Sequence, residues 1–230
     1  MRVVTWNILD GRAGRFDAIA SVLRHVDADV VALQEANDRD LAERLAVVLE
    51  MELVYGEANS PFAIAWLSRL PIARSENHRL PVLGKTLLEV EVGGLRLFAT
   101  HLSAGRAPKD EPRRVSEVEA ILERVGDGQC MLVGDFNSAH PGDEVGLAPA
   151  EEHAPPGYVS RRPIELVLEY GFVDCFRALH PDERGWTFTS AQPWARFDFV
   201  FATRGLDIQS CDVLASARNA SDHFPVVAEV

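Results

Sequence analysis

This chain has few cysteines and only short runs of apolar residues. Its 230 residues include three cysteines, Cys130, Cys175 and Cys211, an odd number without CxxC spacing. Disulfide frameworks and thiolate zinc sites need more cysteines, so we expect these three to be buried small apolar side chains. The longest apolar runs, such as Val30–Leu33, fall far short of the roughly 20 residues that cross a bilayer. The first residues show no signal-peptide pattern, and we expect a cytoplasmic protein without a membrane span.

Positive charge is also scarce. The formal net charge is −12 at pH 7, and the only lysines are Lys85 and Lys109. Duplex nucleic acid is bound chiefly through Lys and Arg side chains that neutralise phosphates, so this balance disfavours long nucleic acid as a partner. It does not exclude nucleic acid, because carboxylates gathered around metal ions carry charge that the ions offset.

Composition is otherwise that of an ordinary globular protein, with 47% hydrophobic and 25% charged residues, which excludes disordered and fibrous classes. No repeat or low-complexity segment is present. A chain of this length can bury one large core, and we expect a single domain over residues 1–230.

Four predicted buried strands end at polar residues of metal-ligand or phosphate-contact type. The strand 2–8 contains Asn7, 29–33 leads to Glu35, 95–100 leads to His101, and 131–134 leads to Asp135 and Asn137. Polar residues often follow strands, but four such coincidences in one chain favour a common site. Open sheets carry their sites beyond the strand ends, so we expect these side chains to meet.

The remaining pattern predicts helices and further strands. Apolar residues spaced by 3 and 4 predict helices over 16–23, 41–49 and 115–125, with Glu117, Glu119 and Glu123 on the solvated side of the third. Further strands are expected over 63–67, 87–92, 95–99, 197–202, 206–215 and 225–230, with a hairpin turn at Gly93-Gly94. The long irregular stretch 138–160 follows Asp135 and Asn137, and we expect it to form a wall of the substrate pocket.

Seven motifs occur in a fixed order along the chain: Thr5-Trp6-Asn7, Leu33-Gln34-Glu35, Leu67-Ser68-Arg69-Leu70-Pro71-Ile72, Thr100-His101-Leu102, Gly134-Asp135-Phe136-Asn137, Arg196-Phe197-Asp198-Phe199-Val200 and Ser221-Asp222-His223. In this order they resemble the endonuclease/exonuclease/phosphatase superfamily, which has the pancreatic deoxyribonuclease-like fold. The resemblance implies an α+β protein built as a four-layer α/β/β/α sandwich, in which two packed mixed sheets are flanked by helices.

The same resemblance implies a site that holds Mg²⁺ or Mn²⁺ against a phosphate ester. Hydrolysis of such an ester needs charge neutralisation, an activated water and a stabilised leaving group, and hard cations with oxygen ligands suit these tasks. Glu35 is then the principal metal ligand, and the other implied ligands are Asp222, Asn7 and Asp135. The implied catalytic residues are Asp135, Asn137, His101, Asp198 and His223, and the implied phosphate contacts are Asn7, His101, Asn137 and His223.

Several assignments within this site stay open. Asp198 is expected to orient His223, and either Asp135 or His223 activates the water. Asn7 contacts the phosphate, binds metal or orients Glu35. The number of metal ions is open as well.

Other residues have weaker claims on function. Trp194, His140 and His153 are candidates for substrate contact, whereas Trp186 is expected to pack beneath the site. Arg69 is expected to be structural, and His25, His78 and His180 to be surface or packing residues. The cluster after His101 is either a solvated face or a contact for a second phosphate; its members are Arg106, Lys109, Arg113 and Arg114.

The leading hypothesis is therefore a metal-dependent hydrolase that cleaves a phosphodiester or phosphomonoester in a small molecule, nucleotide or lipid headgroup, by in-line attack of water. The alternative within the enzyme class is a repair-type endo- or exonuclease acting on DNA or RNA, which the charge balance weakens. A non-catalytic binding module on the same fold is less favoured, because every position that the resemblance expects is filled.

Overall fold

The computed structural model describes all residues except 12, 149–156 and 218–219. Its strands form two six-stranded mixed sheets. The order in the first sheet is β11 (Ser210–Val213), β12 (Val226–Glu229), β1 (Arg2–Asn7), β2 (Val30–Gln34), β4 (Ile64–Ser68) and β3 (Glu52–Gly56). The order in the second is β5 (Ile72–His78), β6 (Leu87–Val92), β7 (Leu95–His101), β8 (Cys130–Asp135), β10 (Asp198–Thr203) and β9 (Phe172–Asp174).

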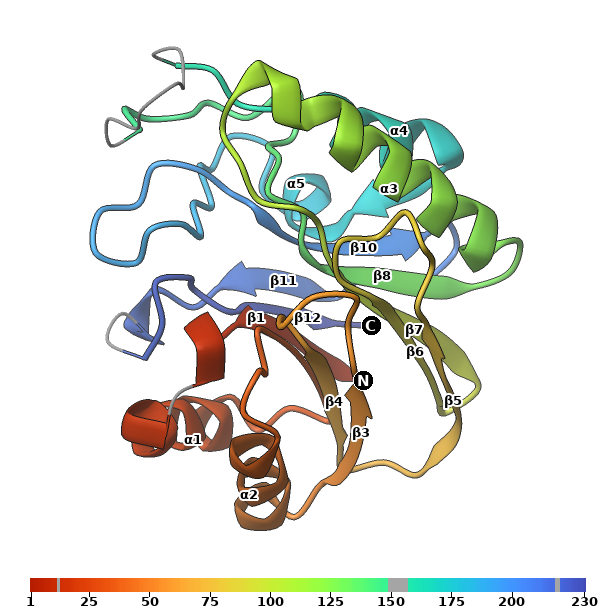
Figure 1. The fold of residues 1–230 in the computed structure, drawn as a ribbon, viewed down its shortest axis with the longest axis vertical. Coiled ribbons are helices and arrows are strands. Elements are labelled where there is room, and N and C mark those ends of the chain that lie inside the picture. The colour runs from red at the N-terminus through yellow and green to blue at the C-terminus, as the bar shows by residue number, and fades with distance from the viewer. Residues whose placement is uncertain (12, 149–156, 218–219) are drawn as a thin grey trace.

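Helices cover the outer faces of the two sheets (Figure 1). The first sheet is covered by α1 (Phe16–Val26) and α2 (Arg39–Leu49), and the second by α3 (Glu111–Val125) and α4 (Arg162–Tyr170). A short helix, α5 (Cys175–Leu179), and four 3-10 turns complete the described elements; the turns are Leu9–Gly11, Ala13–Arg15, Pro108–Asp110 and Ala215–Ala217. The predicted four-layer sandwich is confirmed. No helix within the described residues is both long and apolar enough to cross a bilayer.

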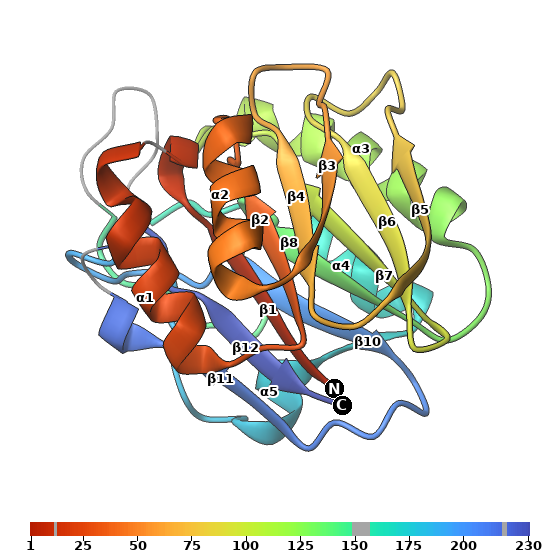
Figure 2. The ribbon, with the colours of Figure 1, turned by 90° about the horizontal axis from the view of Figure 1, so that it is seen from below.

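Three apolar layers hold the sandwich together. The central layer lies between the two sheets and includes Val3, Trp66, Leu97 and Val133. A second lies beneath α1 and α2, and a third lies between the second sheet and α3 with α4. Side chains alternate between the two faces of a strand, so both sheets can contribute one face to the central layer and one to a helix layer. Figure 2 shows α1 and α2 lying across the first sheet, with the two chain termini side by side.

Glycines at a hairpin turn and within a strand fix the geometry of the second sheet. Gly93 and Gly94, with φ of 60° and 81°, form the predicted hairpin turn between β6 and β7. Such a turn needs positive φ at both central residues. Gly134 in β8 has φ 143°, and a Cβ added there would lie 1.9 Å from the carbonyl oxygen of Thr100. The close approach of β7 and β8 directly before Asp135 therefore requires glycine.

Some local predictions are incomplete or wrong. The periodicity did not indicate β3, β5, β9, α4 or α5, and β11 is shorter than the predicted strand 206–215. Glu117 was expected on a solvated face but is 1% exposed. Its carboxylate accepts hydrogen bonds from the backbone nitrogens of Gly84 and Ser103, so it is a buried anchor between loops. Glu119 and Glu123 are exposed as predicted, and the three cysteines are buried and free.

Candidate active site

The predicted polar residues meet at one edge of the sandwich because of the strand registers. In the first sheet β1 and β2 are parallel, and Asn7 lies opposite Gln34, the residue before Glu35. In the second sheet β7 and β8 are parallel, and His101 lies opposite Asp135. The antiparallel strand β10 places Asp198 opposite Asp135 on its other side. The ends of both sheets thus deliver these residues to the same place.

Asn7 connects the two sheets through its side chain. Its Nδ2 donates to Glu35 Oε1 at 3.2 Å and to Asp135 Oδ2 at 3.0 Å. Its Oδ1 accepts a hydrogen bond from the backbone nitrogen of Leu9 at 3.0 Å, which fixes the orientation of the amide. Among the roles left open by the sequence, this geometry favours Asn7 as the residue that orients Glu35 and Asp135.

Glu35 is held in a specific backbone conformation. Its φ of 57° is in the left-handed region, which is uncommon for residues other than glycine and occurs at functional sites. Its Oε2 accepts a hydrogen bond from the backbone nitrogen of Asp10 at 3.0 Å, and Asp10 also has a positive φ, of 63°. The side chain of Glu35 is 14% exposed. The carboxylate is therefore fixed in position and still reachable from solvent.

His223 and Asp198 form the predicted pair. His223 Nδ1 lies 2.8 Å from Asp198 Oδ2, which leaves Nε2 directed towards Asp135 Oδ2 at 3.8 Å. Burial disfavours the charged imidazole, but the carboxylates of Asp198 and Asp135 outweigh burial and raise the pKa of His223 to about 10, with a further contribution from Asp222. His223 is therefore a cationic hydrogen-bond donor in this arrangement.

The segment carrying His223 is tied to β1. The backbone oxygen of His223 accepts a hydrogen bond from Trp6 Nε1 at 2.9 Å, and Ser221 Oγ donates to the backbone oxygen of Asn7 at 2.7 Å. Asp222 lies between these anchors and is half-buried. Trp6 and Asn7 belong to one motif and Ser221 and His223 to another, so these contacts join the two motifs in space.

Two further predicted residues lie beside Asp135. His101 Nε2 is 3.3 Å from Asp135 Oδ2 and 4.0 Å from Glu35 Oε1. Burial, together with the charges of Lys85 and His223, lowers the pKa of His101 well below its usual value, so its imidazole is neutral. Asn137 has φ 46°, and its backbone nitrogen donates to Asp135 Oδ1 at 2.9 Å.

Asp135 lies at the centre of these contacts and is 1% exposed. Burial raises the pKa of Asp135 to about 6, although His223 and Lys85 act in the opposite direction. A carboxylate with such a pKa is suited to accepting a proton near neutral pH.

The structure changes the interpretation of several outlying residues. Trp194 was a candidate for substrate contact, but it is 1% exposed and packs in a cluster with Ala139, Ala195 and Phe197. Its ring therefore cannot serve as a stacking surface in this conformation. The half-buried Trp186 donates from Nε1 to the backbone oxygen of Glu144.

The basic residues after His101 do not form one solvated face. Arg114 is fully buried and donates to the backbone oxygens of Ser103 and Gly105. Arg106 lies with its guanidinium 5.3 Å from the ring of Trp194, whereas Lys109 is exposed. Burial thus excludes Arg114 as a contact for a second phosphate.

The remaining predictions concern loop and surface residues. His140 is half-buried, and its Nδ1 accepts a hydrogen bond from the backbone nitrogen of Gly142. His153 lies outside the described residues, as does part of the loop 138–160. Arg69 pairs with Asp27 at 2.6 Å on the surface, which agrees with its predicted structural role.

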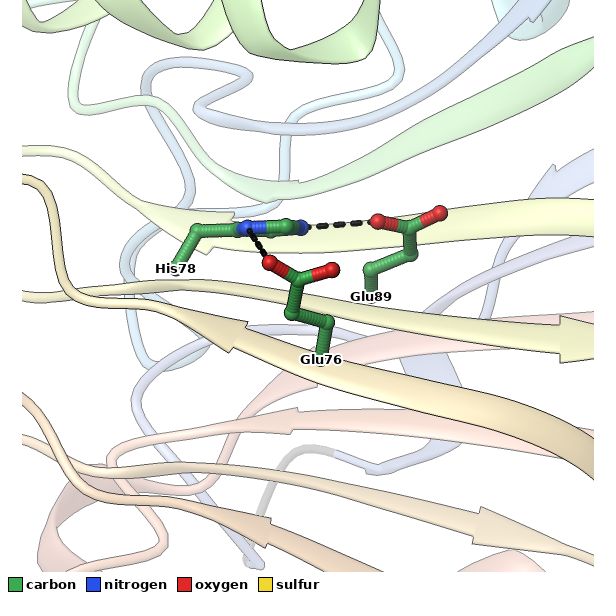
Figure 3. Close-up of side chains that lie close together, drawn as sticks. All are labelled: Glu76, His78 and Glu89. Carbon is green, nitrogen blue, oxygen red and sulfur yellow. Dashed lines mark hydrogen bonds and ion pairs between the residues drawn. The ribbon is translucent and has the colours of Figure 1, made fainter.

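A second group of titratable side chains lies away from this site on β5 and β6 (Figure 3). His78 Nε2 is 2.7 Å from Glu89 Oε2, and His78 Nδ1 is 3.2 Å from Glu76 Oε1. Arginines already engage these groups: Arg124 donates to both His78 Nδ1 and Glu76, and Arg96 donates to Glu89. We therefore interpret the group as a charge network that joins the sheet edge to α3.

Sequence comparison gives the family of this chain. Residues 4–223 match the sequence profile of the Endonuclease/Exonuclease/phosphatase family. The chain belongs to this family. This match confirms the predicted family and, with it, the predicted enzyme class, a hydrolase acting on phosphate ester bonds.

The individual proteins that this chain resembles have low sequence identity to it. A 5′-tyrosyl-DNA phosphodiesterase of Caenorhabditis elegans is 30% identical over 135 residues, which make up 54% of this chain and 37% of that protein. The 3′ phosphatase NExo from Neisseria, solved with a product DNA hairpin, has a TM-score of 0.81 at 22% identity, covering 100% of this chain and 98% of that one. For an AP endonuclease from Archaeoglobus fulgidus the TM-score is 0.79 at 20% identity, with 100% and 98% covered. At these identities the two structures show a shared fold.

Proposed function

We propose that this protein hydrolyses a phosphodiester or phosphomonoester of a small molecule, nucleotide or lipid headgroup, using Mg²⁺ or Mn²⁺ held at Glu35. Two observations carry the proposal: the Asn7 amide joins Glu35 to Asp135, and His223, paired with Asp198, faces Asp135. The net charge of −12 supports a small substrate over long nucleic acid.

The donor set around Asn7 fits a hard divalent cation. Glu35 Oε1 and Asp135 Oδ2 both accept from Asn7 Nδ2, so the two carboxylates face a common space. Oxygen ligands of this kind suit Mg²⁺ and Mn²⁺, and Asp222 is the further ligand expected from the resemblance. When bound, the cation would neutralise phosphate charge and lower the pKa of a coordinated water.

A different cation position is less suitable. Asp135, Asp198 and His223 also offer ligand atoms that lie within 4.8 Å of one another. However, His223 Nδ1 and Asp198 Oδ2 are already paired at 2.8 Å. We therefore place the cation on the Glu35 side of Asp135.

The side chains divide the remaining tasks among them. Asp198 holds His223 so that Nε2 donates to a phosphate oxygen, and Asp135 accepts the proton of the attacking water. His101 and Asn137 donate hydrogen bonds to non-bridging oxygens, which increase in charge as the water attacks in line. The proposal thus takes Asp135, rather than His223, as the base, and it involves no covalent enzyme intermediate.

A Glu35→Gln variant tests the proposal. We expect turnover of bis-p-nitrophenyl phosphate with Mg²⁺ or Mn²⁺ to fall by more than the roughly 10- to 100-fold that loss of an outer-shell partner costs. Circular dichroism and the thermal midpoint should remain those of a folded protein. The matched control is Glu43→Gln in α2, where the carboxylate forms an exposed pair with Arg39. Equal turnover of wild type and Glu35→Gln would refute Glu35 as the metal ligand.

A repair-type nuclease or DNA-end phosphatase is the second candidate. It is favoured by the activities for which similar proteins are named, a tyrosyl-DNA phosphodiesterase, a 3′ phosphatase and an AP endonuclease. Activity on abasic or 3′-phosphate duplex DNA that falls steeply with rising salt would establish this candidate over a small substrate. Wild type that binds but turns over none of these substrates would instead support a binding module.

A further inference from the structure

Lys85 is a buried cation beside the candidate active site that the sequence motifs do not include. It lies two residues before β6 and is 6% exposed. Its Nζ donates to the backbone oxygen of Leu102 at 2.8 Å and lies 5.3 Å from the centre of the Phe62 ring. Phe62 in turn contacts His101 edge-on, with ring centroids 6.2 Å apart. Lysine is rarely fully buried without a partner, so this position calls for a reason.

The neighbourhood of Lys85 is built by Glu117. The Glu117 carboxylate accepts hydrogen bonds from the Gly84 nitrogen at 2.9 Å and from the Ser103 nitrogen at 2.8 Å. It thereby holds the residue before Lys85 against the residue after Leu102. A Cβ at Gly84 would lie 2.7 Å from Ser103 Oγ, so glycine allows this approach. The hydrogen bond from Lys85 to Leu102 therefore follows from several independent contacts.

The Leu102 carbonyl oxygen also accepts a hydrogen bond from a residue of the site. Asn137 Nδ2 donates to this oxygen at 3.1 Å, so Lys85 and Asn137 share one acceptor. Leu102 directly follows His101, and its nitrogen donates to the backbone oxygen of Asp135 at 2.9 Å. Lys85 and Asn137 are thus joined through one carbonyl oxygen, and the residue that carries it is bonded to the backbone of Asp135.

Electrostatics connect Lys85 to those carboxylates. Burial lowers the pKa of Lys85 to about 8, while the charges of Asp135 and Glu35 act against burial. In return, Lys85 lowers the pKa of both Asp135 and His101. A positive charge fixed here weakens the attraction of Glu35 and Asp135 for a cation and adds to the attraction for a phosphate.

We infer that Lys85 is a positioning residue of the phosphoesterase site, whose ammonium group moderates metal binding at Glu35 and Asp135 and holds Asn137 through Leu102. The inference rests on the proposed function. It assigns no contact between Lys85 and the reacting atoms.

The test compares Lys85→Met, which removes the charge at similar length, with Lys85→Arg, which keeps it. The exposed Lys109→Met is the matched control, since it removes the chain's other lysine. Calorimetric titration with Mn²⁺ alone, without substrate, should show roughly tenfold tighter binding to Lys85→Met, because an adjacent unit charge has been removed. The kcat for a phosphate ester should fall about 10- to 100-fold, as for other residues that orient a metal site. Lys85→Arg should retain the wild-type Mn²⁺ affinity.

A measurement on wild type avoids dependence on the variants. With ¹³Cε-labelled lysine the protein should give two sets of signals, and Mg²⁺ addition should shift that of Lys85 and leave that of Lys109 unchanged. Unchanged or weaker Mn²⁺ binding by Lys85→Met, or an unshifted Lys85 signal in a protein that binds Mg²⁺, would overturn the inference. Wild type that binds no metal would instead refute the proposed function, so the two failures are distinguishable.

Discussion

Replacing Arg196 by methionine should destabilise the fold strongly, because Arg196 is the cation of a buried network just before Asp198. Its guanidinium is 1% exposed and donates to two carboxylates. Nε and Nη2 donate to Asp143 at 2.9 and 3.3 Å, and Nη1 and Nη2 donate to Asp174 at 2.9 and 2.6 Å. In the variant, Asp143 keeps its pair with Arg177 at 2.7 Å, whereas Asp174 loses its cation partner.

The size of the effect follows from leaving a buried carboxylate without its cation. Removing one partner of a buried ion pair costs about 3–5 kcal/mol, out of a total stability of roughly 5–15 kcal/mol. For a chain of this size, that loss lowers the thermal midpoint by about 6–20 °C. Methionine retains much of the packing volume over Phe199, where the guanidinium carbon lies 4.4 Å from the ring centroid, so the effect is mainly electrostatic.

Urea-induced unfolding, followed by circular dichroism, measures the change in free energy. The control is Arg39→Met, which removes an exposed pair with Glu43 at 2.9 Å and should cost no more than about 1 kcal/mol. An Arg196→Met variant that loses no more stability than this control would refute the argument that the buried network supports the strand carrying Asp198.

Three further outcomes are expected. Gly134→Ala should lose at least about 3 kcal/mol of stability or fail to fold, because its Cβ would lie 1.9 Å from the Thr100 carbonyl oxygen; a soluble variant with the wild-type urea midpoint would contradict this. Glu111→Gln should cost about 1–2 kcal/mol at neutral pH, because the Glu111 carboxylate accepts hydrogen bonds from the first backbone nitrogens of α4. Burial raises the pKa of Glu111, but these hydrogen bonds outweigh burial and hold the pKa below its usual range. The difference in unfolding free energy between wild type and variant should therefore be complete above the pKa of an unfolded glutamate and should disappear as Glu111 is protonated at lower pH; a pH-independent difference would contradict the assignment. His223→Ala and Asp198→Asn should lower turnover non-additively, as side chains acting as one unit do, and simple additivity in the double variant would contradict their coupling.

The positions of Asn7, Glu35, His101 and Asp135 could be predicted because they depend on short-range pattern and general sheet geometry. Each directly ends or follows a buried strand, and parallel pairing brings strand ends to the same edge. Predicting these four positions therefore did not require the conformation of any loop. The pairing of His223 with Asp198 came from the resemblance, since the two residues are 25 positions apart and on separate elements.

Glu117 and Lys85 show where sequence reasoning stopped. The helical period places Glu117 on the polar side of α3, but two loops close over that side and bury its carboxylate. Such burial depends on contacts between distant segments, which periodicity does not encode. Lys85 had one sequence signal, as one of only two lysines in the chain, but rarity alone indicates no role.

Trp194 shows the converse limit. Its place in a loop beside the Arg196 motif made this tryptophan a candidate for substrate contact, yet its ring packs with Ala139, Ala195 and Phe197. The helix α4 was also missed, although Pro163 at its start, buried Ile164 and Val167, and Gly171 after its end are local signals of a helix. What has no local signature is the hydrogen bond from the Arg161 nitrogen to Glu111, 50 positions away.

The position of the divalent cation tests the account most directly. A crystal grown with Mn²⁺ and a phosphate-ester analogue, measured for anomalous scattering, locates the ion without reference to activity. We predict a manganese peak within coordination distance of the Glu35 carboxylate, with the phosphate reached from His223. A peak at the Glu76–His78–Glu89 group, or none near Glu35 in a protein that hydrolyses the ester, would contradict the account.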